Sequence, residues 1–203
     1  MYYKGEKIDR PSFHHNDFHG YGDKIKRELG KHIPRNRKLR VLDIGTGFGA
    51  VAGFLSKHLS KSSKLWTVDP AREMLEGAKM MLAKEGLDKR IPIEFVKADA
   101  SNLDFEDGFF DIVVSVMVLH HVQDLNSVLK ELLRVLKKGG KLILVDYVPK
   151  ASMILEFHRR HAESDFFEPK MVAESIKQIG SVKVRLKTRP PASAQSSRDS
   201  GIF

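Results

Sequence analysis

Apolar and polar positions along the chain follow two different periods. From residue 40 onward, short runs rich in β-branched residues alternate with longer segments whose apolar residues recur at helical spacing. The short runs predict strands at 40–44, 65–68, 93–96, 110–116, 141–146 and 182–187, and the longer segments predict helices at 48–59, 71–84, 124–136, 152–161 and 169–179. Strands that alternate with helices in this way are typical of a parallel sheet that is covered on both faces.

The strand count depends on the C-terminal part of the chain. After the predicted strand 182–187 there is no further β-rich run, so the sheet has six strands, or a short seventh strand forms near residues 201–203. A length of 203 residues suits one domain with a full core. We therefore expect an α/β fold with a single, doubly wound, mostly parallel sheet of six or seven strands and helices on both faces.

The first predicted strand leads into a glycine-rich turn. Asp43 lies near its end, and Gly45, Gly47 and Gly49 follow before the next helix begins. Glycine allows a tight reversal and a close approach of the backbone to a ligand. The N-terminus of the following helix presents free N–H groups and a positive dipole end to an anion. Such a turn is built for a nucleotide-bearing cofactor, and both dinucleotides and S-adenosylmethionine fit it.

The acid before the turn helps to choose between these cofactors. The dinucleotide fingerprint is formally present as Gly45, Gly47 and Ala50, with Asp69 at a suitable distance for a ribose. Asp43, however, would repel a pyrophosphate and attract the ammonium group of S-adenosylmethionine. Strand ends in a doubly wound sheet meet at the switch point, so we expect Asp43, Asp69, Asp99 and Ser115 to converge on one crevice.

Several segments together resemble the class I S-adenosylmethionine-dependent methyltransferases. The similarity spans about residues 38–148 and is closest to the small-molecule enzymes of the menaquinone and ubiquinone biosynthesis type. The matching segments are 43–49, 67–75, 98–100, 110–122 and 134–140. The resemblance implies a Rossmann-like fold, methyl transfer by in-line displacement, and a cofactor that is S-adenosylmethionine.

The resemblance also implies roles for individual residues. Asp69 would hold both ribose hydroxyls, and Asp99 would accept a hydrogen bond from the adenine amine. The cofactor-binding residues expected in this way are Asp43, Gly45, Thr46, Gly47, Asp69, Pro70, Asp99, Ala100 and Ser115. Residues 38–188 would form the methyltransferase domain, residues 1–37 a lid or cap, and residues 189–203, which are rich in serine and proline, a flexible tail.

Histidines supply the candidate chemistry toward the acceptor. We expect His120, just past the strand 110–116, to act as a general base, although a packed or capping histidine is an equally good interpretation. In the lid, the expected acceptor contacts are Tyr21 and one of His14, His15 or His19. No metal site is expected, because adjacent histidines do not easily point at one ion.

Composition and charge bear on the partner and the location of the protein. The net charge is +9, and its excess lies at the two ends of the chain. Such flanks suit nucleic acid, but no basic stripe with interleaved aromatic residues is present, which favours a solvated surface or tails near a small anionic substrate. No apolar run reaches the ~20 residues of a membrane span, and the chain has no cysteine. We expect a cytoplasmic protein, and the sequence sets no oligomeric state.

Two other functions remain open at this point. One is a nicotinamide-dependent oxidoreductase with the same glycine turn. The other is an RNA-directed methyltransferase or a protein that binds S-adenosylmethionine without catalysis. Methyltransferases that need a cysteine, such as the cytosine-C5 enzymes, do not fit a chain without cysteine.

Overall fold

The computed structural model describes residues 2–3, 6–7, 17–148, 169–179 and 201–202. The predicted helix 152–161 and the predicted strand 182–187 lie outside these residues. The chain divides into two compact units, residues 1–34 and residues 35–203, and each is described by itself. No described helix has both the length and the apolar character that a membrane crossing requires.

The first unit contains a strand pair and a helix that the sequence analysis did not predict. β1 (Tyr2–Tyr3) pairs with β2 (Glu6–Lys7) in antiparallel orientation. α1 (Asp17–His32) is an amphipathic helix. Two of its residues, Ile25 and Leu29, and Ile33 directly after it are buried at a spacing of four positions, which is the signal that could have revealed the helix.

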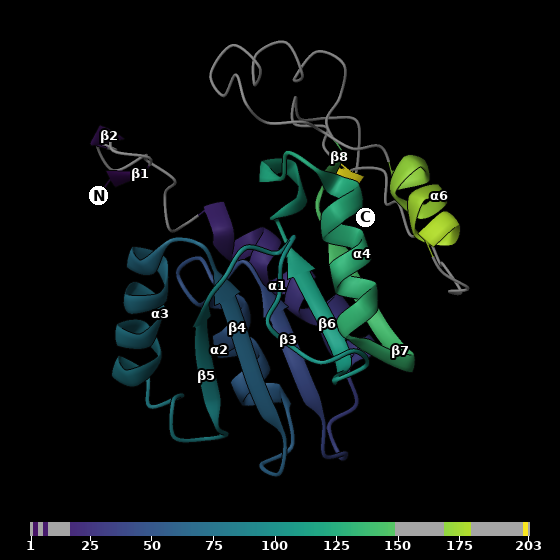
Figure 1. The fold of residues 1–203 in the computed structure, drawn as a ribbon. Coiled ribbons are helices and arrows are strands. Elements are labelled where there is room, and N and C mark those ends of the chain that lie inside the picture. Colours follow the sequence, from purple (N-terminus) through teal and green to yellow (C-terminus); the bar gives the residue numbers. More distant parts are fainter. Residues whose placement is uncertain (1, 4–5, 8–16, 149–168, 180–200, 203) are drawn as a thin grey trace, which may run out of the picture. The chain divides into compact units, whose positions relative to one another are not determined.

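The second unit is built on a five-stranded parallel sheet (Figure 1). Its strands are β3 (Arg40–Ile44), β4 (Lys64–Asp69), β5 (Ile93–Lys97), β6 (Phe110–Val116) and β7 (Leu136–Val145). Their order is β5-β4-β3-β6-β7, so the chain moves outward in one direction from β3 and in the other direction from β6. A switch point therefore lies between the carboxyl ends of β3 and β6, where ligands bind in sheets of this kind.

The expected count of six or seven strands is not confirmed, because the predicted strand 182–187 lies outside the described residues. Within the described residues the main sheet has five strands. The short strand expected near the C-terminus does form, as β9 (Gly201–Ile202), but it pairs with β8 (Tyr147–Val148) in a separate antiparallel sheet. Strand β7 also starts earlier than predicted, because Leu136 already pairs with Phe110 before a register shift.

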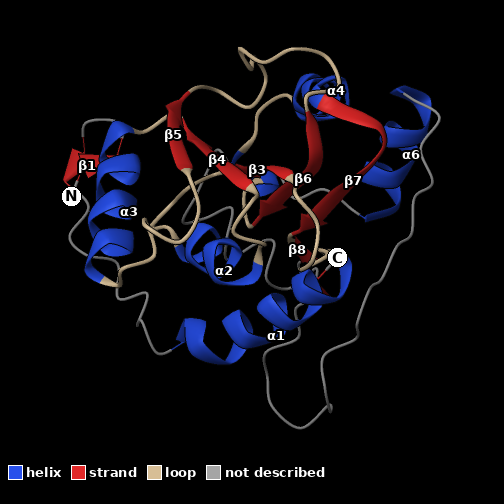
Figure 2. Ribbon diagram, turned by 90° about the horizontal axis from the view of Figure 1, so that it is seen from below, coloured by secondary structure: helices blue, strands red, loops and turns tan. Residues whose placement is uncertain are grey.

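Helices cover both faces of this sheet (Figure 2). α2 (Ala50–His58) and α3 (Arg72–Lys84) lie on one face, and α4 (Leu125–Val135) and α6 (Pro169–Ile179) lie on the other. A short 3-10 helix, η1 (Leu119–His121), connects β6 to α4. α4 begins where predicted, since the Asp124 side chain accepts a hydrogen bond from the Ser127 N–H at 3.0 Å.

The strand register assigns side chains to the two faces. Leu42, Trp66 and Val113 are register partners on one face, and they belong to a core cluster with residues of α4 and α6. Asp43 and Thr67 alternate with these residues and therefore lie on the face that carries α2 and α3. This division decides which strand-end side chains can share a ligand.

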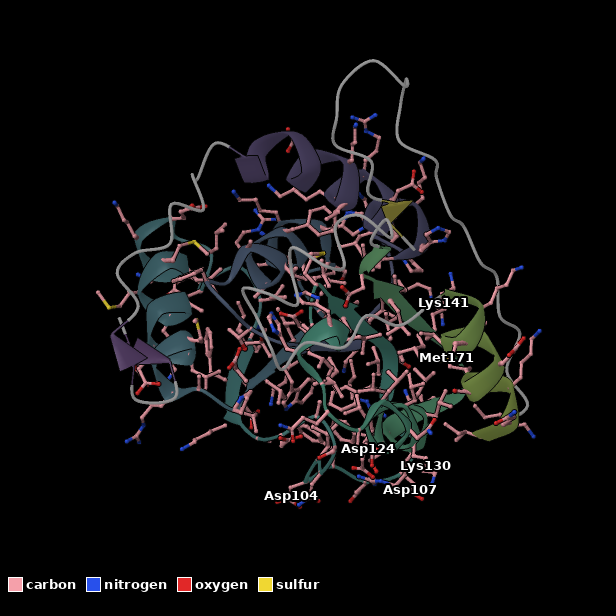
Figure 3. The ribbon with its side chains drawn as sticks, turned by 90° about the horizontal axis from the view of Figure 1, so that it is seen from above. Asp104, Asp107, Asp124, Lys130, Lys141 and Met171 are labelled. Carbon is pink, nitrogen blue, oxygen red and sulfur yellow. The ribbon has the colours of Figure 1, made fainter. Side chains whose placement is uncertain are left out.

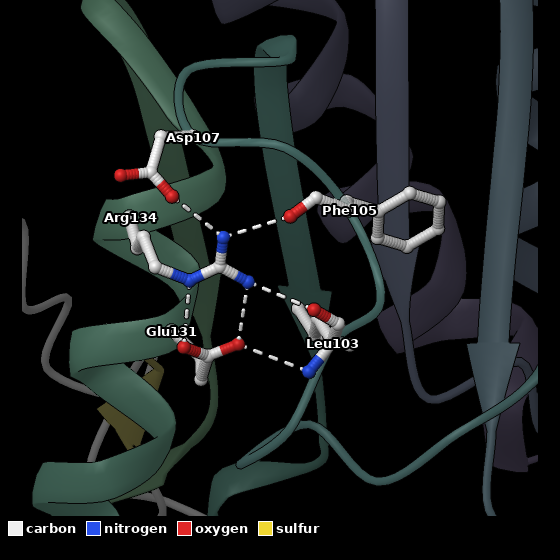
Figure 4. A network of polar contacts seen from close by, with 5 residues as sticks. All are labelled: Leu103, Phe105, Asp107, Glu131 and Arg134. Atoms are coloured by element: carbon white, nitrogen blue, oxygen red, sulfur yellow. Dashed lines mark hydrogen bonds and ion pairs between the residues drawn. The ribbon is translucent and has the colours of Figure 1, made fainter.

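Arg134 on α4 anchors the loop between β5 and β6 (Figure 4). Its guanidinium donates to the carbonyl oxygens of Leu103 and Phe105 and to the carboxylates of Asp107 and Glu131, at 2.7 to 2.9 Å. Glu131 also accepts the Leu103 N–H, and the hydrogen bond from Arg134 lowers the pKa of this glutamate. The loop is thus fixed to α4 without a helix of its own.

Candidate functional site

The glycine turn lies at the switch point and is held by β4. Gly45 N–H and Thr46 N–H both donate to the Val68 carbonyl oxygen, at 2.8 and 3.1 Å. Gly45 has φ 78°, and a Cβ there would overlap the side chain of Val118, which follows β6. Gly47 has φ 48°, and a Cβ there would meet no atom within 4 Å. The turn is therefore packed against the segment after β6 at Gly45 and open at Gly47.

Asp43 lies buried beneath this turn. Its Oδ2 accepts a hydrogen bond from the Thr67 hydroxyl at 2.9 Å, and Thr67 is 2.7 Å from the Thr46 hydroxyl. The second oxygen, Oδ1, is buried and has no hydrogen-bond partner among the described residues. Burial raises the pKa of Asp43 to about 8. A buried carboxylate oxygen without a partner is costly, so this position fits a cationic or hydrogen-donating ligand group.

Asp69, at the end of β4, organises the backbone around the turn. Its Oδ2 accepts the Gly47 N–H at 3.0 Å, and its Oδ1 accepts the Ala71 N–H at 2.9 Å before α3 begins. Each carboxylate oxygen has two lone pairs, so both oxygens retain one acceptor site. Pro70 is exposed beside it. Asp43 and Asp69 are thus brought together on the α2 side of the sheet, as predicted for a shared crevice.

Asp99 follows β5 at the same edge of the sheet. It is exposed, and its Oδ1 accepts both the N–H and the hydroxyl of Ser101, at 2.8 and 2.7 Å. Ala100 is half-buried next to it. Both hydrogen bonds reach the same oxygen, which leaves the other oxygen of Asp99 for a donor such as an exocyclic amine.

Ser115 does not join these acids through its side chain. It is the register partner of Ile44 on β3 and of Leu144 on β7, and it therefore lies on the α4 face, opposite to Asp43. Its hydroxyl is buried and has no hydrogen-bond partner in the described part of the chain. The expected convergence of Ser115 with Asp43 is wrong for the side chain, because residues 43 and 115 differ by one position in register.

His120 lies in η1 and pairs with an acid that the sequence analysis missed. Its Nδ1 is 2.7 Å from Oδ1 of Asp146, and its backbone N–H donates to Oδ2 of the same carboxylate at 3.4 Å. Asp146 directly follows β7 and is 2% exposed, and His120 is 7% exposed. An acid directly after β7, the strand that neighbours β6, was the signal that could have found this pair.

The candidate acceptor residues of the N-terminal segment are not tested by the structure. His14 and His15 lie outside the described residues. His19 and Tyr21 lie on α1, whose side chains are not described at these two positions. Among the residues whose side chains are described, no group of three or more His, Asp or Glu side chains could hold a metal ion.

Comparison with known proteins identifies the family. A family described as a methyltransferase domain matches residues 42–144. The ubiquinone/menaquinone biosynthesis C-methyltransferase UbiE of Desulfotalea psychrophila is 35% identical over 116 residues, which are 57% of this chain and 44% of that protein. The chain spans less than half the length of this and other curated relatives that it matches.

Solved structures agree with this family. The crystal structure of YcgJ from Bacillus subtilis has a TM-score of 0.58 at 30% identity, covering 70% of this chain and 57% of that one. The phosphoethanolamine N-methyltransferase 2 of Haemonchus contortus in complex with S-adenosyl-L-methionine has a TM-score of 0.65 at 25% identity, covering 77% and 36%. The family that the sequence motifs predicted is confirmed.

Proposed function

Since the chain belongs to the methyltransferase domain family that matches residues 42–144, we propose that it transfers a methyl group from S-adenosylmethionine to a small-molecule acceptor. The observation that carries this proposal is Asp43. It places a buried, unpartnered carboxylate oxygen beneath a turn that is open at Gly47. A dinucleotide phosphate would meet the same carboxylate with repulsion, which is the reason for preferring the sulfonium cofactor.

We propose that individual residues of the site bind individual groups of this cofactor. Asp43 would bind the ammonium group, beneath the turn formed by Gly45, Thr46 and Gly47. The remaining lone pairs of Asp69 would accept the ribose hydroxyls, and the second oxygen of Asp99 would accept the adenine amine. When bound, S-adenosylmethionine supplies an already activated methyl group, so the protein mainly aligns the acceptor and excludes water.

His120 is our candidate for the general base. Its position just past β6 places it two residues after Val118, which packs against the turn at Gly45. An acceptor that must lose a proton would give it to this imidazole as the new bond to carbon forms. The support for this role is the packing of Val118, two residues earlier, against the glycine turn, together with the burial of His120, which is 7% exposed.

The acceptor class is proposed from the relatives and from charge. The names of the relatives describe C- and N-methyltransferases of small molecules, including one of ubiquinone and menaquinone biosynthesis. The basic ends of the chain suit an anionic member of such a class, in preference to nucleic acid. We propose further that Tyr21 and one of His14, His15 or His19 contact the acceptor, and that the protein acts in the cytoplasm.

Cofactor binding is the first test. Isothermal titration calorimetry with S-adenosylhomocysteine should give saturable heat, and NAD should give none. Saturable heat with NAD and none with S-adenosylhomocysteine would instead identify an oxidoreductase.

Methyl transfer is the second test. Transfer of labelled methyl from S-adenosylmethionine is measured to a reduced naphthoquinone, a catechol and phosphoethanolamine. Against the acceptor that is methylated, His120→Ala should lower turnover more than about tenfold with little change in cofactor affinity. Saturable cofactor binding without transfer to any acceptor supports a binding protein, and an unchanged rate removes His120 from the mechanism.

A further inference from the structure

Two buried polar side chains meet beyond the carboxyl ends of β6 and β7. The imidazole of His120 and the carboxylate of Asp146 are 2.7 Å apart, with side-chain exposures of 9% and 3%. The same carboxylate also accepts the backbone N–H of His120 through its other oxygen. One acid therefore holds both the ring and the backbone of a single histidine, which fixes the ring with respect to the chain that carries it.

We propose that Asp146 is a positioning residue that holds the neutral His120 ring with its proton on Nδ1 and its lone pair on Nε2. This inference rests on the proposed function, since it concerns the base of the same reaction. A carboxylate can only accept hydrogen bonds, so an imidazole nitrogen 2.7 Å away must be the one that carries the proton. The other nitrogen is then the basic one.

The segment that carries His120 is itself held at both sides. Met117 N–H donates to the Val145 carbonyl oxygen at 2.7 Å, directly before Asp146. Val118 packs against Gly45 of the glycine turn. Met117 has φ 60°, an uncommon conformation for a residue with a side chain, and such strain is often found at functional sites. The position of the His120 ring is thus tied to β7 and to the cofactor turn together.

Asp146 should also stabilise the charge that forms on His120 during methyl transfer. As an acceptor atom bonds to the methyl carbon, the electron pair of the broken carbon–sulfur bond stays on sulfur and neutralises its positive charge. The acceptor proton moves to Nε2 of His120, and the ring becomes an imidazolium. The carboxylate of Asp146 stabilises this cation at hydrogen-bond distance, in a buried environment where the interaction is strong.

The tautomer of His120 can be measured without knowing the acceptor. Long-range ¹H–¹⁵N spectra of protein with labelled histidine are recorded at about pH 8.5, where an ordinary imidazole is neutral. The signals that disappear in His120→Gln belong to His120. The expected wild-type pattern has the proton on Nδ1, and a wild-type ring with its proton on Nε2 overturns the proposal.

Asp146→Asn tests whether the Asp146 carboxylate decides which ring nitrogen of His120 carries the proton. The single oxygen of the asparagine should face the His120 backbone N–H, which leaves its NH₂ group to donate to Nδ1. The proton of the ring should therefore move to Nε2. A variant that lowers the melting temperature while the proton stays on Nδ1 would show that the pair is only structural, and it would refute the proposal.

Binding and turnover separate this inference from the proposed function. Asp146→Asn should bind S-adenosylhomocysteine within about twofold of wild type, yet lower kcat at least about tenfold with the cofactor KM unchanged. The double variant His120→Gln/Asp146→Asn should be no slower than His120→Gln, because both residues act in one step. If the wild-type protein does not bind S-adenosylhomocysteine, the proposed function is refuted. The role of Asp146 is decided separately, by the ¹H–¹⁵N spectra.

Discussion

Asp43 and Ser115 lie near the ends of neighbouring strands, β3 and β6, and each buries an oxygen atom without a hydrogen-bond partner. They lie on opposite faces of the sheet. Asp43 is on the side of α2, beneath a glycine turn and next to two threonine hydroxyls. Ser115 is on the side of α4, level with Ile44 and Leu144. Our proposal gives a ligand to Asp43 and not to Ser115, because only at Asp43 do an ionisable group and an open turn accompany the unpartnered oxygen.

The largest effect that we predict separates these two residues. Asp43→Asn removes the charge without changing the size of the side chain, and a hydrogen bond to a charged group contributes about 1.5–3 kcal/mol. S-adenosylhomocysteine should therefore bind about 10- to 150-fold more weakly, as measured by calorimetry. Ser115→Ala should leave its affinity within about twofold and leave the melting temperature unchanged or slightly raised, because a buried unpaired hydroxyl is removed.

A charge control makes the comparison specific. Asp104 is an exposed acid in the loop before β6 (Figure 3), and Asp104→Asn makes the same carboxyl-to-amide replacement as Asp43→Asn at a position away from the turn. The affinity of Asp104→Asn for S-adenosylhomocysteine should equal that of the wild-type protein. Equal losses in Asp43→Asn and Ser115→Ala would contradict the assignment of the cofactor site to the α2 side.

The raised pKa of Asp43 sharpens the comparison, because Ser115 does not titrate. Burial raises the pKa of this carboxyl from 3.8 to about 8, so the folded protein holds its proton across a range in which the unfolded chain has lost it. The stability from this group is therefore greatest below about pH 4 and falls as pH rises toward about 8. An ammonium ligand needs the ionised form, so cofactor affinity should show the opposite trend and rise with pH.

The measurement of this linkage is a calorimetric titration with S-adenosylhomocysteine. Below about pH 7 the affinity should increase by up to about tenfold per pH unit, and level off above about pH 8. In buffers of different ionisation enthalpy, binding at neutral pH should release a proton from the wild-type protein. Asp43→Asn should release none from this site, and the same proton release in both proteins would refute the linkage.

The sequence predicted the elements that depend on local pattern. The strands β3 and β6 and the helix α6 have the predicted bounds, because continuous β-branched runs and a helical apolar face are visible without any partner. The Asp124 cap was predicted for the same reason. Strand β7 was predicted too short, since residues 137–140 are lysines and glycines and nothing local shows that Leu136 pairs with Phe110.

The candidate site was predicted only in part, for a different physical reason. Asp43 and Asp69 could be placed at one edge from strand order alone. The face of Ser115 depends on the register between β3 and β6, where a shift of one residue exchanges the two faces. The pairing of His120 with Asp146 depends on β6 and β7 being neighbours, which joins residues 26 positions apart. Neither relation is contained in a local pattern.

The smallest change in cofactor affinity is predicted for Arg134. This residue lies on α4 and holds the loop between β5 and β6 (Figure 4). Arg134→Lys keeps the charge but loses the planar fork, so carbonyl oxygens of Leu103 and Phe105 lose their donors. The free energy of unfolding in urea should fall by about 1–2 kcal/mol. Lys130→Arg, at an exposed position of the same helix, should change it by less than about 0.5 kcal/mol. S-adenosylhomocysteine affinity should stay within about twofold in both variants. A large loss of affinity in Arg134→Lys alone would mean that the α4 side of the sheet also shapes the cofactor site.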